Sequence, residues 1–183
     1  EYIFYSSNIS SITFNNNLIG AHMFDNCDQI TDLVITPSVT MVRDYAFANC
    51  DGFINHSGQN IVFNNNYIGK HMFYNNSNLE SIDFTNNTTE NGDVIEYIGY
   101  ASVGNCTKLS SIVIPFTGNH LYTDSASEET LFGYIFGKEF IEGSKEYISF
   151  ASQRYSDEST AIIFALPKSL KTVTITRSIT LGY

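Results

Sequence analysis

Short runs of alternating hydrophobic and other residues recur along the chain. In 12–14 and 112–114, for example, two apolar side chains lie two positions apart around a middle residue. This period of two is typical of a β-strand that buries one face and exposes the other. The pattern predicts strands at 12–14, 33–35, 61–63, 82–84, 112–114 and 173–175.

A second segment recurs together with the strands. Its four copies occupy 19–27, 42–50, 68–76 and 98–106, at steps of 23, 26 and 30 residues. One strand and one turn cannot bury their apolar side alone, whereas stacked copies form a continuous core with a parallel sheet along one face. The repeats therefore predict a solenoid.

The repeat unit resembles that of the BspA-like leucine-rich-repeat family, which reads approximately Leu-x-x-Ile-x-Ile-Pro and then Val-x-x-Ile-Gly-x-x-Ala-Phe-x-x-Cys. Residues 109–115 and 38–50 match this unit closely. The resemblance implies a mainly β leucine-rich-repeat solenoid, with a parallel β-sheet on one face and turns with short irregular or 3-10 segments on the other. It also implies a bacterial cell-surface or secreted protein, in a family whose members are proposed to act in adhesion.

We expect residues 1–183 to form a single leucine-rich-repeat domain that is a fragment of a longer array. The regular spacing breaks after the fifth predicted strand, because 61 residues separate Ile112 from Val173. We predict an insertion over 117–165, which looks like an insertion type of secreted members of the family. Within it, residues 131–136 are interpreted as a degenerate copy of the repeated turn.

Composition narrows the range of partners. The 9 basic and 19 acidic residues give a net charge of −10 without any basic run, so no nucleic-acid partner is expected. The longest apolar stretches, such as 161–166, are far shorter than the roughly 20 residues of a membrane span. We therefore expect no membrane insertion by this segment.

The three cysteines, Cys27, Cys50 and Cys106, occupy one repeat position, which favours small buried side chains that pack against their neighbours. A bridge between Cys27 and Cys50 stays open, because stacked strands lie about 4.8 Å apart, within the range of a disulfide. No Cys-x-x-Cys pattern supports zinc binding. His22 and His71 are expected roughly 10 Å apart, since Tyr45 stands between them, and so cannot share a metal ion.

Scaffold or solvent-exposed roles are expected for the remaining polar candidates. Asn residues at one repeat position are expected to bond main-chain groups of the turns, and these are Asn26, Asn49, Asn75 and Asn105. The alternative is a ladder of amide side chains that faces a ligand. The acidic residues of the insertion lack the glycine and the alternation of an EF-hand loop. Because the common catalytic and nucleotide-binding motifs are also absent from the sequence, we expect no catalytic residue, metal or cofactor.

Two surfaces are candidates for binding. The middle residues of the predicted strands, which should face outward, are small and mostly neutral, and they are Thr13, Val34, Val62, Asp83, Val113 and Thr174. The insertion instead carries many aromatic side chains on a long loop, a common place for function. Contacts are expected between the insertion and the rim of the strand face, with candidate residues Asp83, Val113, Tyr122, Phe132, Tyr134, Tyr147 and Tyr155. The alternative is that most of these aromatics pack internally.

These observations favour an extracellular or cell-surface module that binds a protein or glycan partner, as in adhesion. The alternative is a structural spacer that presents another domain of the parent protein, which the plain strand rows favour. A more distant alternative is a part of a surface enzyme whose catalytic domain lies elsewhere in the parent protein.

Overall fold

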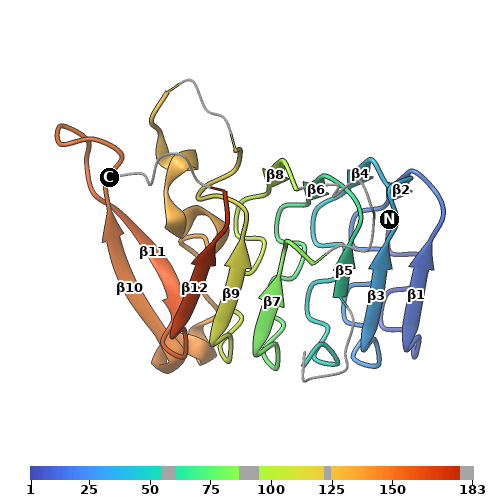
Figure 1. Ribbon diagram of the computed structural model, residues 1–183. Helices are drawn as coiled ribbons and strands as arrows, with labels where there is room; N and C mark the ends of the chain where they lie inside the picture. Colours follow the sequence, from blue (N-terminus) through green and yellow to red (C-terminus); the bar gives the residue numbers. More distant parts are fainter. Residues whose placement is uncertain (55–60, 87–94, 122–124, 178–183) are drawn as a thin grey trace.

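Parallel strands line one face of the molecule (Figure 1). The computed structural model describes residues 1–54, 61–86, 95–121 and 125–177. The strands form two three-stranded sheets, in the orders β1-β3-β5 and β12-β9-β7. Their bounds are Ser11–Phe14 (β1), Asp32–Ile35 (β3), Ile61–Phe63 (β5), Ser81–Asp83 (β7), Ser111–Ile114 (β9) and Thr172–Ile175 (β12).

The register of these strands follows the predicted triplets. Middle residues pair with middle residues, as Thr13 with Val34 and Val113 with Thr174. Thr13 and Thr174 are exposed, and Val34, Asp83 and Val113 are half-buried, as predicted for an outward row. Val62 is the exception, because it is only 6% exposed and all three residues of β5 are buried.

The opposite side consists of short strands and turns. Leu18–Ile19 (β2) pairs in parallel with Met41–Val42 (β4), and Tyr67–Ile68 (β6) pairs with Tyr97–Ile98 (β8). The turns that follow bond to one another through the main chain. The amide groups of Phe24, Phe47 and Phe73 donate to carbonyl groups of the next turn at 2.8–3.0 Å.

A ladder of phenylalanine rings fills the core between the two sides. The rings of Phe24 and Phe47 are stacked at 5.3 Å with an interplanar angle of 4°, and those of Phe47 and Phe73 at 6.1 Å. All three side chains are buried. Because a single turn exposes its ring on both sides, stacking of copies is what removes these rings from water.

The asparagines of the turns form a second ladder, through bonds between side chains rather than the predicted bonds to main-chain groups. Each of the four has a positive φ, between 54° and 62°, a conformation that Asn tolerates better than most residues. Asn75 Nδ2 donates to Asn49 Oδ1 at 2.7 Å, and Asn105 Nδ2 donates to Asn75 Oδ1 at 2.5 Å. Asn49 Nδ2 donates instead to Asp25 Oδ1 at 2.7 Å.

Replacing Asn75 by alanine is expected to lower the free energy of unfolding by about 2 kcal/mol or more. The change removes two hydrogen bonds. It also places alanine at φ 58°, a conformation that asparagine tolerates better than alanine does. Asn75→Gly loses the same bonds but tolerates the conformation, so it should cost less. Urea denaturation of both variants checks this, and equal costs would contradict a conformational contribution.

The insertion continues the stack of turns. Its 3-10 helix η2, Phe132–Ile135, accepts hydrogen bonds from the fourth turn, from Ala101 N to Tyr134 O and from Val103 N to Ile135 O, both at 3.0 Å. Two further 3-10 helices, η1 (Glu128–Thr130) and η3 (Glu142–Tyr147), flank η2. Ser144 of η3 donates its hydroxyl to Asn105 Oδ1, and Ile141 N donates to the same oxygen at 3.3 Å, so η3 closes the asparagine ladder.

The fourth turn is adapted to this contact by small side chains. Ala101 and Gly104 stand where the third turn has His71 and Tyr74. A Cβ on Gly104 would lie 2.8 Å from Phe136 O, too close for any larger residue. The departures of this copy from the repeat therefore follow from the space that the insertion needs.

Candidate functional site

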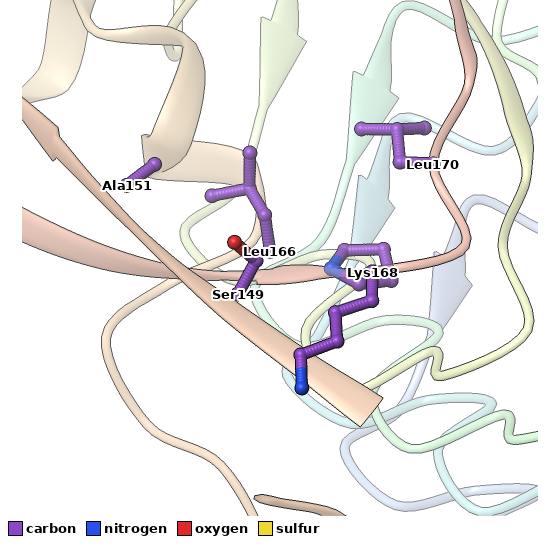
Figure 2. Close-up of a pocket in the computed structure, with 6 residues that line it drawn as sticks. Ser149, Ala151, Leu166, Lys168 and Leu170 are labelled. Carbon is purple, nitrogen blue, oxygen red and sulfur yellow. The ribbon is translucent and has the colours of Figure 1, made fainter. Parts of the chain in front are cut away.

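A depression of about 270 Å³ lies where the insertion leads into the last strand (Figure 2). Its walls come from an antiparallel hairpin, β10 (Ile148–Gln153) and β11 (Ile162–Pro167), and from the turn between β11 and β12. The lining residues are Ser149, Ala151, Leu166, Pro167, Lys168 and Leu170. The lining thus combines apolar side chains with one hydroxyl and one ammonium group.

Alternation along the hairpin places these residues on one face. Ser149 lies opposite Leu166, and Ala151 lies opposite Phe164. Phe164 is fully buried against η2, where a Cβ on Gly133 would lie 2.2 Å from its ring. Gly133 N also donates to Gln153 Oε1 at 2.9 Å. The hairpin is therefore fixed to the insertion's helix, and the depression has a rigid wall.

The rim of the depression is held by the turn at 167–171. Lys168 N donates to Tyr147 O at 2.8 Å, and Lys168 Nζ donates to Glu146 O at 2.7 Å. Ser169 Oγ contacts Thr107 O at 2.9 Å and Leu109 O at 2.7 Å, which ties the turn to the fourth repeat. Lys168 is exposed, and its side chain runs away from Leu166 and Leu170 (Figure 2).

The candidate contact residues chosen from sequence lie in different surroundings. Tyr147 is 52% exposed and borders the depression through its carbonyl bond to Lys168, whereas Tyr134 is only 5% exposed. Phe132 and Tyr155 are half-buried. Asp83 and Val113 are half-buried on the strand face, and Asp83 Oδ1 accepts bonds from Thr85 at 2.6 and 2.8 Å. Tyr122 lies outside the described residues.

Exposed apolar side chains on the hairpin were missed as site residues. Phe150 and Ile163 are 50% and 57% exposed, and they are diagonal neighbours on one face, because Phe150 pairs with Ala165 and Ser152 pairs with Ile163. The available signals were the alternation of 148–153 and the continuous apolar run of 161–166, and neither segment carries a repeat motif. We call Phe150 and Ile163 the hairpin patch.

A hydrogen-bonded pair joins the insertion to the fourth repeat. Tyr100 Oη donates to Glu139 Oε2 at 2.8 Å and accepts from Lys138 N at 2.9 Å. Burial raises the pKa of Tyr100, and its hydrogen bond to the Glu139 carboxylate raises this pKa further. Partial burial would raise the pKa of Glu139, but the bond from Tyr100 and main-chain bonds lower it overall. Glu139 therefore stays ionised at neutral pH, and the contact persists.

The histidines lie in a stack on the turn side. Tyr45 is sandwiched between His22 at 4.8 Å and His71 at 4.4 Å, with nearly parallel rings. This confirms that a tyrosine separates the two histidines, which cannot share a metal ion. Among the described residues, no group of three or more His, Cys, Asp or Glu side chains is arranged to hold one.

The stability of the chain is expected to fall in mild acid because of His71. Burial lowers the pKa of this imidazole below its ordinary 6.5. The unfolded chain then takes up a proton near pH 6.5 and the folded chain only at lower pH, so the free energy of unfolding decreases as the pH falls through that window. His71→Tyr keeps the stack, as Tyr45 does one turn earlier, and should have a flatter profile in urea denaturation. An identical profile would contradict this origin.

The cysteines are buried and free, so Cys27 and Cys50 are not bridged. Each thiol donates to a main-chain carbonyl of the preceding turn, Cys50 to Phe24 O at 3.1 Å and Cys106 to Phe73 O at 3.1 Å. Asn76 replaces a cysteine in the third copy and donates to Phe47 O at 3.2 Å in the same way. The repeat position therefore needs a small donor rather than a reactive sulfur.

We expect the three thiols to resist alkylation in the native protein at neutral pH. Burial raises the pKa of Cys106 to about 12 and also raises that of Cys50, so little thiolate forms. Mass spectrometry after iodoacetamide treatment should find no adduct without denaturant and three adducts in denaturant without a reductant. A single adduct in denaturant would reveal a disulfide and contradict the assignment of three free thiols.

Comparison with known proteins agrees with the repeat pattern. The profile of the BspA type leucine rich repeat region matches residues 1–131 in six copies. Searches of curated proteins and of solved structures gave no match. None of the helices in the described part of the chain is long and apolar enough to span a lipid bilayer. The matched region indicates a protein-binding or repeat module, and it covers well over half of the sequence, so the chain belongs to the BspA type leucine-rich-repeat family.

Proposed function

We propose that this chain is an extracellular or cell-surface solenoid module that binds a protein partner through the hairpin patch. The observation that carries the proposal is the exposure of large apolar side chains on the hairpin, with Phe150 and Ile163 each at least half exposed. Such side chains are the ones that contribute most to protein interfaces when they become buried.

The rigid base of the hairpin adds support. Its inner face is fixed by Phe164 and Gln153, so the outer side chains are presented without a large ordering cost on binding. The strand rows contribute less, because Asp83 is bonded to Thr85 and the other middle residues are small. An adhesive role outside the cell is the form of binding that the family favours.

The test is solution binding of the 183-residue chain to a panel of extracellular matrix proteins and surface glycans. Phe150→Ser combined with Ile163→Ser should abolish saturable binding to a matrix protein while circular dichroism stays unchanged. The matched control is Leu18→Ser with Met41→Ser, which are also exposed, at 38% and 46%, but lie on β2 and β4. Equal loss in both pairs would contradict a site on the hairpin.

A spacer is the second candidate function, favoured by the small, mostly neutral side chains of the strand rows. A spacer would bind none of the panel while folded, so neither pair of substitutions would change the measured binding. Saturable binding of a glycan that survives the hairpin substitutions would instead favour a site on the strand face.

A further inference from the structure

The loop between β10 and β11 carries a basic residue at the tip of the hairpin (Figure 1). Arg154 directly follows β10 and is exposed. Within the described ranges, neither its main-chain amide nor its carbonyl group has a main-chain partner. The bonds found further along the loop are local, since Ser156 and Ser159 bond to each other at 2.9–3.2 Å. A segment of this kind opens more easily than the paired strands on either side of it.

Opening of this loop matters because a protease must draw a stretch of chain into its cleft before it can cut. Proteases of the trypsin class also need a Lys or Arg side chain for their specificity pocket. The sequence has 9 such residues, and all of them lie in the described part of the chain. Each of these side chains is exposed, so exposure alone does not choose among them.

The main chain separates Arg154 from the other basic residues. The carbonyl groups of Lys70 and Lys145 accept hydrogen bonds, and Lys108 directly precedes Leu109, which is fully buried. Cutting at the other positions therefore requires contacts with the rest of the fold to break first, whereas cutting after Arg154 requires only its own loop to open. The remaining basic residues donate hydrogen bonds from their main-chain amides at 2.8–2.9 Å, and they are Arg43, Lys138, Lys168, Lys171 and Arg177.

Contacts on both sides of the loop hold together a chain that is cut there. The two strands that the loop joins pair in antiparallel along their whole length, 148–153 with 162–167. Phe164 is fully buried, and a Cβ on Gly133 would lie 2.2 Å from its ring, so β11 packs closely on η2. After β11, β12 pairs with β9. The part of the chain that follows the loop therefore stays attached to the part before it through non-covalent contacts.

We propose that the peptide bond between Arg154 and Tyr155 is a processing site for a serine protease of the trypsin class, and that the nicked chain stays folded. Hydrolysis consumes one water molecule and leaves a carboxylate on Arg154 and an amino group on Tyr155. The hairpin patch survives the cut, because Phe150 and Ile163 lie on the two paired strands. The inference adds a covalent modification to the proposed function and does not depend on which partner binds.

The experiment treats the native 183-residue chain with a low concentration of trypsin and follows the fragments by mass spectrometry. We expect the first cut after Arg154, about tenfold or more faster than at any other Lys or Arg. The two fragment masses should sum to the mass of the chain plus one water. Size-exclusion chromatography without denaturant should elute the fragments together, with an unchanged circular dichroism spectrum.

Arg154→Gln should remove the first cut, and Arg154→Lys should keep it, because the pocket of trypsin accepts either cation. Lys145→Gln is the matched control, since Lys145 is also an exposed residue of the insertion but its carbonyl group is bonded in η3. The control should be cut after Arg154 as fast as the parent chain. The proposal is overturned if the first cut falls at another residue, if Arg154→Gln is cut as fast as the parent, or if the fragments separate without denaturant. The proposed function is tested separately, because the order of cutting does not depend on binding of a matrix protein.

Discussion

Phe47→Ala is expected to lower the free energy of unfolding by about 3–5 kcal/mol. Phe47 is fully buried and its ring contacts four other phenylalanines, so the substitution leaves a cavity at the centre of the ladder, lined by Phe14, Phe24, Phe53 and Phe73. Because repeat proteins gain stability from contacts between neighbouring copies, the loss weakens two interfaces at once. Urea denaturation followed by circular dichroism measures the change.

Phe150→Ala is the control for this prediction, since it removes the same side chain from a position that is 50% exposed. It should change the free energy of unfolding by less than about 1 kcal/mol. Similar costs at Phe47 and Phe150 would contradict the assignment of the phenylalanine ladder to the core.

Replacing residues 118–160 by a short Gly-Ser linker is expected to abolish cooperative folding. The deletion removes five buried apolar side chains, each worth about 1.5–3 kcal/mol, and they are Leu131, Tyr134, Ile135, Phe136 and Ile148. Together they approach the whole stability of a typical domain, about 5–15 kcal/mol. The deletion also exposes the fourth turn to solvent, and the amides of Ala101 and Val103 lose their main-chain acceptors.

Thermal denaturation of the deleted chain and binding of a hydrophobic dye measure the result. Shortening only the 154–160 loop between β10 and β11 serves as control, because its described bonds, between Ser156 and Ser159, are local. The shortened chain should fold like the parent. A deleted chain that still unfolds cooperatively would mean that the insertion is an independent loop on a complete stack.

The repeated part of the fold was predictable because its signal is repeated. A period of two indicated which residues of each strand face the core, and equivalent positions in successive triplets indicated the register, as in the pairing of Thr13 with Val34. The positions of Asn75 and Cys50 could be interpreted for the same reason, since each recurs in equivalent turns. Val62 was missed because its burial depends on what surrounds β5 rather than on its own alternation.

The insertion could not be predicted in the same way. Tyr134, which is buried, lies in the degenerate turn interpreted at 131–136, whereas Tyr147, which is exposed, lies outside it, yet both were chosen as contact residues. Burial of Tyr134 follows from the stacking of η2 on the fourth turn, a contact between segments about 30 residues apart. The position of the β10–β11 hairpin and of the depression beside it depends on the packing of Phe164 on Gly133. No sequence motif predicts this contact.

The central structural claim is that the insertion continues the stacked core and so forms the rigid base of the surface proposed for binding. Hydrogen exchange of individual amides, measured by NMR, tests it most directly. The account predicts that Ala101 and Val103, which donate to Tyr134 O and Ile135 O, exchange as slowly as Phe73, which donates to Ser102 O within the repeats. Fast exchange at Ala101 and Val103 beside a protected Phe73 would contradict it.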